Sequence, residues 1–224
     1  MVMKMHANQL CDNIMTRHAL IDACRSMNER GLNQGASGNI SARVSDGILI
    51  TRSGVAYDEM SITDIVKIPF VGEPSVHGHR PSSEWRFHQA LFQLREDIAV
   101  VLHAHPTHAT ALAIQRRPIP PCHYMVAAFG GNNIPLAEYA TFGSEKLSAN
   151  ITAVMKNRHA CIMANHGALV VAETVKDALW RMQELETLSK QYLLSFNGGE
   201  ATLLTTAEIE EALTAINGYF KTQI

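Results

Sequence analysis

Short apolar runs, rich in β-branched residues and bounded by glycine, proline or polar residues, recur along this chain. Runs of this length and composition are typical of buried β-strands. They predict strands around Ile40 and over residues 48–51, 66–70, 98–102, 160–164 and 168–172.

Longer stretches with apolar positions three and four residues apart separate these runs and predict helices. The expected helices cover residues 6–30, a segment that follows Ser82, residues 144–156, a segment from Thr174 and a segment from Thr205. The last one opens with Thr205 and Glu208 in the spacing of a capping box. Strands grouped with helices around them predict an α/β (α+β) layered fold with a mostly antiparallel central sheet, as a single domain over residues 1–224.

Composition narrows the class of protein. A chain of 224 residues with 46% hydrophobic content can bury one sizeable core. The net charge of -2 and the lack of a basic run argue against nucleic acid as the main partner. Four scattered cysteines without a C-x-x-C pair, and no apolar run long enough for a signal peptide or a membrane span, predict a cytoplasmic protein with no membrane partner.

Histidines stand at the ends of two predicted strands. His103 and His105 follow the run over residues 98–102, and residues two apart on a strand point to the same face, so both imidazoles can reach one ion. His166 follows the run over residues 160–164 and precedes Gly167, which lets the backbone turn sharply. Each of these two motifs alone is also compatible with histidines that lie near strand ends without binding a metal.

A carboxylate completes this set. Glu84 stands at the start of the helix predicted after Ser82, on or near the apolar face, and we place it in the first helical turn. A carboxylate at that position can also simply be stabilised by the helix dipole and cap the start of the helix. Three imidazoles and one carboxylate are nevertheless the ligand set of a divalent metal, and zinc with room left for substrate is the prediction.

Three further short sequence segments could bind phosphate. Residues 35–39 form a tight Gly/Ser/Asn loop whose amides could surround an anion, and residues 51–54 follow a strand with Thr-Arg-Ser-Gly. Ser82 and Ser83 offer hydroxyls and amides at a helix N-terminus. Such clusters are also common in turns, and none of them matches a Walker loop or a G-x-G-x-x-G pattern.

The order of these sequence motifs resembles that of the class II aldolase/adducin family, and the similarity runs from the first helix to near the C-terminus. The resemblance rests on residues 31–35, 37–41, 51–54, 81–88, 103–105, 139–143 and 165–167. The family fold implies helices on both faces of the sheet and a homotetramer with active sites between subunits. The implied reaction is zinc-dependent cleavage of a ketose 1-phosphate to dihydroxyacetone phosphate and an aldehyde, with L-fuculose 1-phosphate and L-lactaldehyde favoured.

The resemblance also implies residue roles. One Zn²⁺ per subunit would be held by His103, His105 and His166, with Glu84 as fourth ligand and later as acid/base. Tyr124 would act on the substrate hydroxyl from across a subunit boundary. The remaining implied substrate contacts are a phosphate site of Gly38, Asn39, Ser53, Gly54, Ser82 and Ser83, an aromatic wall at Phe142 and a closing tail residue at Tyr219.

Two positions depart from the family pattern: Ala36 replaces a threonine that helps hold phosphate, and Asn165 replaces a histidine before the last ligand. Three alternatives therefore stay open. They are an aldolase for 5-deoxyribulose or methylthioribulose phosphate, a sugar-acid phosphate decarboxylase, and a non-enzymatic interaction module like the adducin head. His88 and His108 are predicted to be hydrogen-bonding groups around the ligands.

Overall fold

The computed structural model describes residues 10–75, 77–199 and 201–221. Its centre is a seven-stranded sheet in the order β3-β2-β1-β4-β7-β6-β5, antiparallel at every pairing except β5 with β6. This confirms the predicted fold class. The strands are β1 (Asn39–Val44), β2 (Gly47–Thr51), β3 (Ile65–Ile68), β4 (Val100–Ala104), β5 (Leu136–Ala137), β6 (Ala160–Met163) and β7 (Gly167–Ala172).

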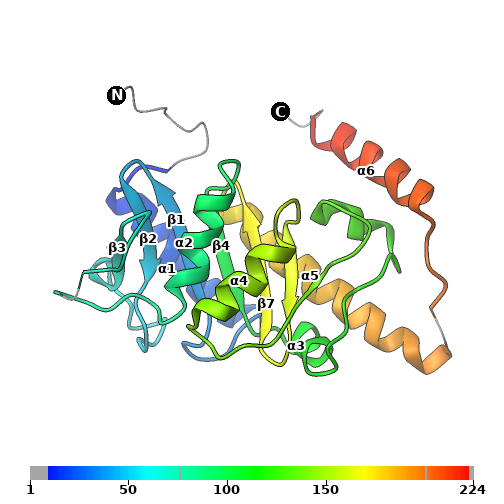
Figure 1. The fold of residues 1–224 in the computed structure, drawn as a ribbon, viewed down its shortest axis with the longest axis horizontal. Helices are drawn as coiled ribbons and strands as arrows, with labels where there is room; N and C mark the ends of the chain where they lie inside the picture. The colour runs from blue at the N-terminus through cyan, green and yellow to red at the C-terminus, as the bar shows by residue number, and fades with distance from the viewer. Residues whose placement is uncertain (1–9, 76, 200, 222–224) are drawn as a thin grey trace.

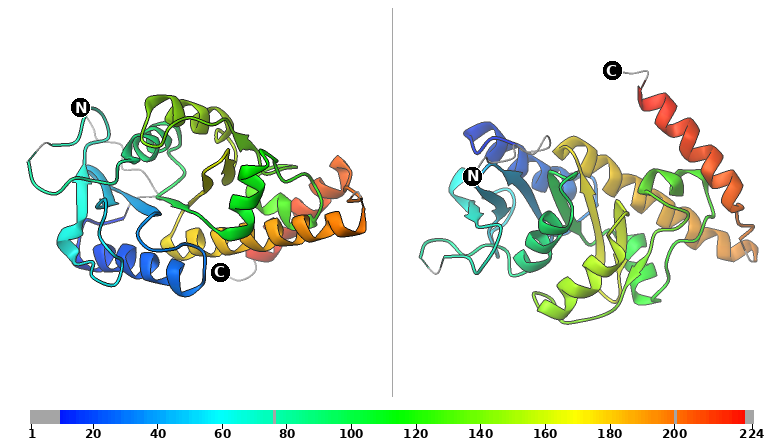
Figure 2. Two further views of the ribbon diagram at one scale, coloured as in Figure 1. Left: turned by 90° about the horizontal axis from the view of Figure 1, so that it is seen from below. Right: turned by 45° about the horizontal axis from the view of Figure 1, so that its top comes forward.

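Helices cover both faces of this sheet (Figure 1), as the two buried clusters on either side of it also indicate. In the left view of Figure 2, α1 and α5 run along one face, while α2 and α4 lie on the other. The helix α6 carries the chain away from the sheet and lies beside the 3-10 turn η2 (Tyr124–Phe129). The helices are α1 (Ile14–Glu29), α2 (Trp85–Leu94), α3 (Thr107–Ile114), α4 (Glu145–Val154), α5 (Val175–Ser195) and α6 (Thr206–Lys221).

Strand β4 shows why the central runs are almost wholly apolar. Val100 and Leu102 belong to the core under α1 and α5, whereas Val101 belongs to the core under α2 and α4. A strand covered on both faces cannot alternate with polar residues. His103 continues the alternation toward the α2 side, where the ring of Phe87 meets it edge-on at 5.9 Å.

The first helix begins later than the sequence suggested. It starts at Ile14, because Asn13 caps it by accepting the Thr16 amide at 2.9 Å. Leu10 instead donates its amide to the Arg43 carbonyl at 2.9 Å beside β1, and residues 6–9 lie outside the described part of the chain. Among the described residues, no helix is both long and apolar enough for a membrane crossing.

Candidate metal centre and active site

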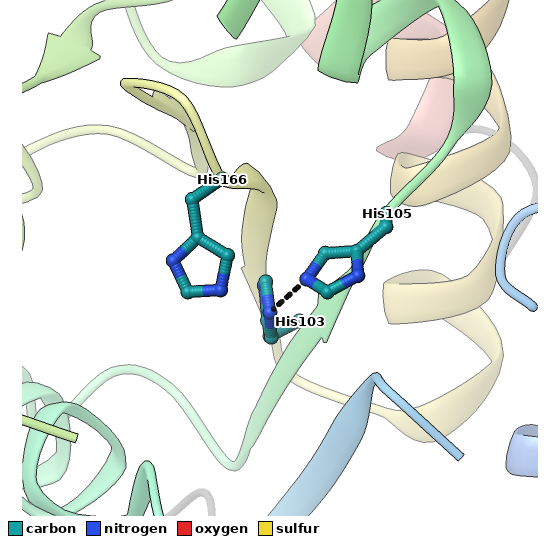
Figure 3. Close-up of side chains that lie close together, drawn as sticks. All are labelled: His103, His105 and His166. Atoms are coloured by element: carbon teal, nitrogen blue, oxygen red, sulfur yellow. Dashed lines mark hydrogen bonds between the residues drawn. The ribbon is translucent and has the colours of Figure 1, made fainter. Parts of the chain in front are cut away.

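Two imidazoles meet at the end of β4. Their Nε2 atoms, from His103 and His105, lie 3.0 Å apart (Figure 3), so both side chains do point to one face as predicted. The Nδ1 of His103 lies 2.9 Å from the Ala168 carbonyl, which can only accept, so Nδ1 carries the proton. The Nε2 of His103 therefore presents a bare lone pair to the centre of the site, as a metal ligand must.

The third imidazole comes from the tight connection between β6 and β7. Asn165 adopts a left-handed conformation with φ of 53° and donates its amide to the Ala113 carbonyl at 2.8 Å. Asparagine tolerates this region better than most residues, so the sharp turn is made at Asn165 and not at Gly167. It directs His166 inward, and the ligand atoms of the three histidines all lie within 4.8 Å of one another (Figure 3).

Burial keeps these histidines neutral. Removal from water, with the neighbouring His105, lowers the pKa of His103 to about 3. Removal from water, with the neighbouring His103, lowers the pKa of His166 to about 4. Three neutral nitrogens converging in one place are suited to a divalent cation, because a cation accepts all three lone pairs at once.

Glu84 faces this cluster from the position just before α2. Its Oε2 lies 3.3 Å from His103 Nε2 and its Oε1 lies 3.5 Å from His166 Nε2. The side chain is buried, and burial raises the pKa of its carboxyl. Oε1 has no hydrogen-bond partner within the described residues. An orphaned buried carboxylate oxygen beside three neutral imidazoles fits a bound cation, which would compensate its charge.

Gly167 is required by close packing behind the ligands. A Cβ atom there would lie 2.6 Å from the Ala104 carbonyl oxygen and 2.6 Å from His105 Cδ2. Because the first contact is with backbone, Gly167→Ala has to displace β4 and its histidines. We expect metal affinity to fall about 10- to 100-fold, as when the groups that orient metal ligands are disturbed. Metal titration of the purified variant measures this.

Gly198→Ala is the matched control, because nothing lies within 4 Å of a Cβ at that exposed position. Its metal affinity should equal that of the unmodified protein. Equal affinity in the Gly167→Ala variant would contradict the assigned packing.

A pocket of about 420 Å³ opens over the cluster. Of the residues predicted from sequence, Ser83 and Phe142 line it together with Glu84, His105 and His166. No site role was predicted for the other lining residues, although each lies within the predicted phosphate loop or within a motif that carries the family resemblance. These additional lining residues are Ser37, Tyr139, Ala140 and Asn165.

The remaining predicted phosphate residues lie around the pocket rather than in its lining. Ser82 Oγ accepts the Glu84 amide at 3.3 Å, and a bridge between Arg52 and Pro81 holds the exposed turn of Ser53 and Gly54 next to it. Gly38 is buried, and a Cβ there would meet the His103 carbonyl at 2.7 Å.

Asn39 differs from these residues, because its buried side-chain amide already donates a hydrogen bond to a residue of the metal cluster. Its Nδ2 donates to Glu84 Oε2 at 3.0 Å. Sequence patterns placed Asn39 in a phosphate site and gave no sign of this contact with the carboxylate.

The structure describes the side chain of only one of the two predicted tyrosines. Tyr124 opens η2, is 53% exposed and is absent from the described lining of the pocket. Tyr219 belongs to α6, but its side chain lies outside what the structure describes. Tyr124 is therefore not part of the pocket of its own chain among the described residues, and the role of Tyr219 stays a prediction.

Comparison with known proteins agrees with this arrangement. Residues 18–193 match the model of the Class II Aldolase and Adducin N-terminal domain. An L-fuculose phosphate aldolase of Escherichia coli O6:H1 is 46% identical over 174 residues, which cover 78% of this chain and 80% of the relative. A 5-methylthioribulose-1-phosphate/5-deoxyribulose-1-phosphate aldolase of Rhodospirillum rubrum is 43% identical over 207 residues, 92% of this chain and 93% of the relative.

Comparison of the fold with solved structures indicates the same family. A solved structure of an L-fuculose 1-phosphate aldolase superimposes with a TM-score of 0.88 at 34% identity, covering 92% of this chain and 98% of that one. The family model spans most of the chain, and both sequence relatives exceed 40% identity. The chain therefore belongs to the class II aldolase and adducin family, as an enzyme of its aldolase branch.

Proposed function

We propose that this class II aldolase cleaves a ketose 1-phosphate to dihydroxyacetone phosphate and an aldehyde, with L-fuculose 1-phosphate as the first candidate substrate. The observation that carries the proposal is the convergence of His103, His105, His166 and Glu84 on one pocket. Class II aldolases depend on a metal, and the three imidazoles would hold it here; zinc is the proposed ion because neutral nitrogen ligands suit it.

Carbon–carbon cleavage places negative charge on the ketone half of the substrate. A bound divalent cation supplies Lewis-acid stabilisation of that charge. The chain must supply the rest, which is to anchor the phosphate, to remove a proton from the hydroxyl beside the breaking bond and to protonate the three-carbon product. Ser83 lines the pocket at the N-terminus of α2, where amides and helix dipole favour phosphate.

Glu84 is the proposed proton carrier for the three-carbon half. Burial raises the pKa of its carboxyl, which brings the group nearer to the pH at which acid and base forms are both accessible. Its Oε1 has no hydrogen-bond partner among the described residues, so this atom would face the metal in the resting enzyme and would take and return the proton during turnover.

Tyr124 is the proposed base for the hydroxyl, acting in a site of a neighbouring subunit of a homotetramer. Its exposure and its absence from the described pocket lining support a role outside its own chain. Tyr124→Phe keeps the ring and removes the proton-transferring group, so we expect kcat to fall at least about 100-fold. Steady-state kinetics measures the loss.

Tyr192→Phe is the control for removal of a tyrosine hydroxyl, because Tyr192 lies on α5, packs against Phe196 and does not line the pocket. A fully active monomer in solution would remove the cross-subunit role of Tyr124. Mixed oligomers of Tyr124→Phe and His105→Ala chains should regain activity if the two residues serve one site from different subunits.

The second candidate substrate class is 5-deoxyribulose 1-phosphate or methylthioribulose 1-phosphate. The Rhodospirillum rubrum relative that carries both names matches more of this chain than the Escherichia coli relative does. Both candidate classes release an aldehyde with an apolar end, which suits the exposed aromatic side chains of Tyr139 and Phe142 at the pocket. The retained metal set disfavours an adducin-like interaction module.

A panel of ketose 1-phosphates tests the proposal. The enzyme should release dihydroxyacetone phosphate from L-fuculose 1-phosphate with the highest kcat/KM. A higher kcat/KM on 5-deoxyribulose or methylthioribulose phosphate would transfer the assignment to the second class. No release from any ketose 1-phosphate, with decarboxylation of a sugar-acid phosphate instead, would contradict both.

A further inference from the structure

A chain of buried polar groups runs from Glu84 away from the pocket into the core under α2. Asn39 Nδ2 donates to Glu84 Oε2 at 3.0 Å, Asn39 Oδ1 lies 2.5 Å from His88 Nε2, and His88 Nδ1 lies 2.6 Å from Ser41 Oγ. Asn39, Ser41 and His88 are all buried, and His88 has no exposed surface. Buried polar groups are expensive unless they are fully paired, so three of them in a row call for a reason.

The fold aligns these groups by two matching spacings. Glu84 immediately precedes α2 and His88 lies four residues later in its first turn, on the same side of the helix. Asn39 and Ser41 are two residues apart on β1 and therefore point to the same face of the sheet. Asn39 is also the cross-strand partner of His103, which fixes it beside the metal ligands.

With Glu84 ionised, the hydrogen-bond directions leave one consistent assignment. The Glu84 carboxylate accepts, so the NH₂ end of the Asn39 amide must face it and the carbonyl end must face His88. A carbonyl cannot donate, so His88 Nε2 carries a proton whatever the charge of the ring. Burial lowers the pKa of His88 and so favours the neutral ring, in which Nδ1 accepts from Ser41 Oγ and all donors point toward Glu84.

The opposite assignment conflicts with the carboxylate. If His88 Nε2 were bare, the Asn39 NH₂ would turn toward it, and Asn39 Oδ1 would face Glu84 Oε2 at 3.0 Å. Two acceptors at that distance repel each other. His88 is thus the group that decides which end of the Asn39 amide Glu84 meets.

We propose that His88 is a positioning residue for the reaction: through Asn39 it engages Oε2 of Glu84 and leaves Oε1 as the oxygen that carries the proton. The inference rests on the role of Glu84 in the proposed function. His88 touches neither the pocket nor a metal ligand by any hydrogen bond in the described residues, so its effect must pass through Asn39.

Two substitutions with similar polarity separate this role from general packing. The amide nitrogen of His88→Gln reaches the position of Nε2 and can still donate to Asn39, whereas the shorter side chain of His88→Asn reaches only toward Ser41. We expect His88→Asn to lose about 10- to 100-fold in kcat with little change in KM and with metal content retained, as for other groups that orient a ligand from behind. His88→Gln should stay within about threefold of the unmodified enzyme, since it keeps the donor.

Leu91→Ala controls for destabilisation, because Leu91 is fully buried on the same helix and takes no part in the hydrogen bonds among Glu84, Asn39, His88 and Ser41. It should lower the melting temperature at least as much as His88→Asn and leave kcat unchanged. The inference is wrong if His88→Asn keeps full kcat, if His88→Gln is equally impaired, or if Leu91→Ala loses the same activity.

A spectroscopic measurement tests the assignment without catalysis. In enzyme labelled with ¹⁵N-histidine, long-range ¹H–¹⁵N correlation distinguishes protonated from bare ring nitrogens, and the His88 signals are identified by their loss in His88→Gln. We expect Nε2 protonated. A bare Nε2 would overturn the inference even if Glu84→Gln is inactive, whereas an active Glu84→Gln variant would overturn the proposed function and leave the tautomer result standing.

Discussion

Glu84→Gln is expected to lower kcat by about 10²- to 10⁴-fold, the usual contribution of a general acid/base group. Glutamine keeps the shape and can still accept the Asn39 amide, but it can neither take nor return a proton. The variant should fold, because the change removes a buried charge whose Oε1 lacks a hydrogen-bond partner in the described residues.

Steady-state cleavage of the best ketose 1-phosphate measures this loss, with metal content determined on the same preparation. Glu59→Gln is the matched control, since that carboxylate is exposed and is not part of the pocket lining. Near-normal kcat in Glu84→Gln would exclude it as the proton carrier. Lost metal in this variant would instead indicate that Glu84 acts chiefly as a ligand.

His105→Ala should abolish both metal retention and activity. His105 is the most informative ligand to remove, because His103 is completely buried and its loss would also leave a cavity in the core. Disturbing the groups that merely orient ligands weakens metal binding by about 10- to 100-fold, so loss of a ligand should exceed that range. Metal analysis after dialysis measures the effect.

His108→Ala is the control for loss of a nearby histidine. His108 Nδ1 pairs with Glu186 at 2.7 Å, away from the cluster, and its backbone amide keeps its own bond to that carboxylate. Retained metal and activity in His108→Ala, with both lost in His105→Ala, is the expected pattern. Full metal content in His105→Ala would contradict the three-histidine site.

Much of the fold followed from periodicity, but not all of it. The central strands were predictable because continuous apolar runs are needed where both faces of a sheet are covered, as at β4. Helix α3 was missed, since its short alanine-rich sequence has no contrast between an apolar and a polar side. Strand β5 was missed because a strand of two residues is too short to show an alternation of apolar and polar positions.

The site divides in the same way. His103 and His105 were predictable because two-residue spacing on a strand fixes their direction, and the structure bears this out. The contact of Asn39 with Glu84 depends on how β1 pairs with β4 and how α2 packs over both. No short sequence motif specifies this strand pairing and helix packing. The contact of Asn39 with Glu84 could therefore not be predicted, and Asn39 was assigned only to the phosphate site.

The structure shows what surrounds the two residues that depart from the family pattern, Asn165 and Ala36. Asn165 has a left-handed backbone conformation and accepts Arg116 Nε at 2.9 Å, so it serves the turn that presents His166. Ala36 is half-buried and packs against the hydrophobic core near α1. Neither position alters the three imidazoles.

Metal removal tests the central claim most directly. Enzyme stripped with a chelator should contain no zinc and show no cleavage of L-fuculose 1-phosphate or the other ketose 1-phosphates. One equivalent of Zn²⁺ per chain should restore full activity, and the same addition to stripped His105→Ala should restore none. Full cleavage by enzyme shown to be metal-free would contradict the account.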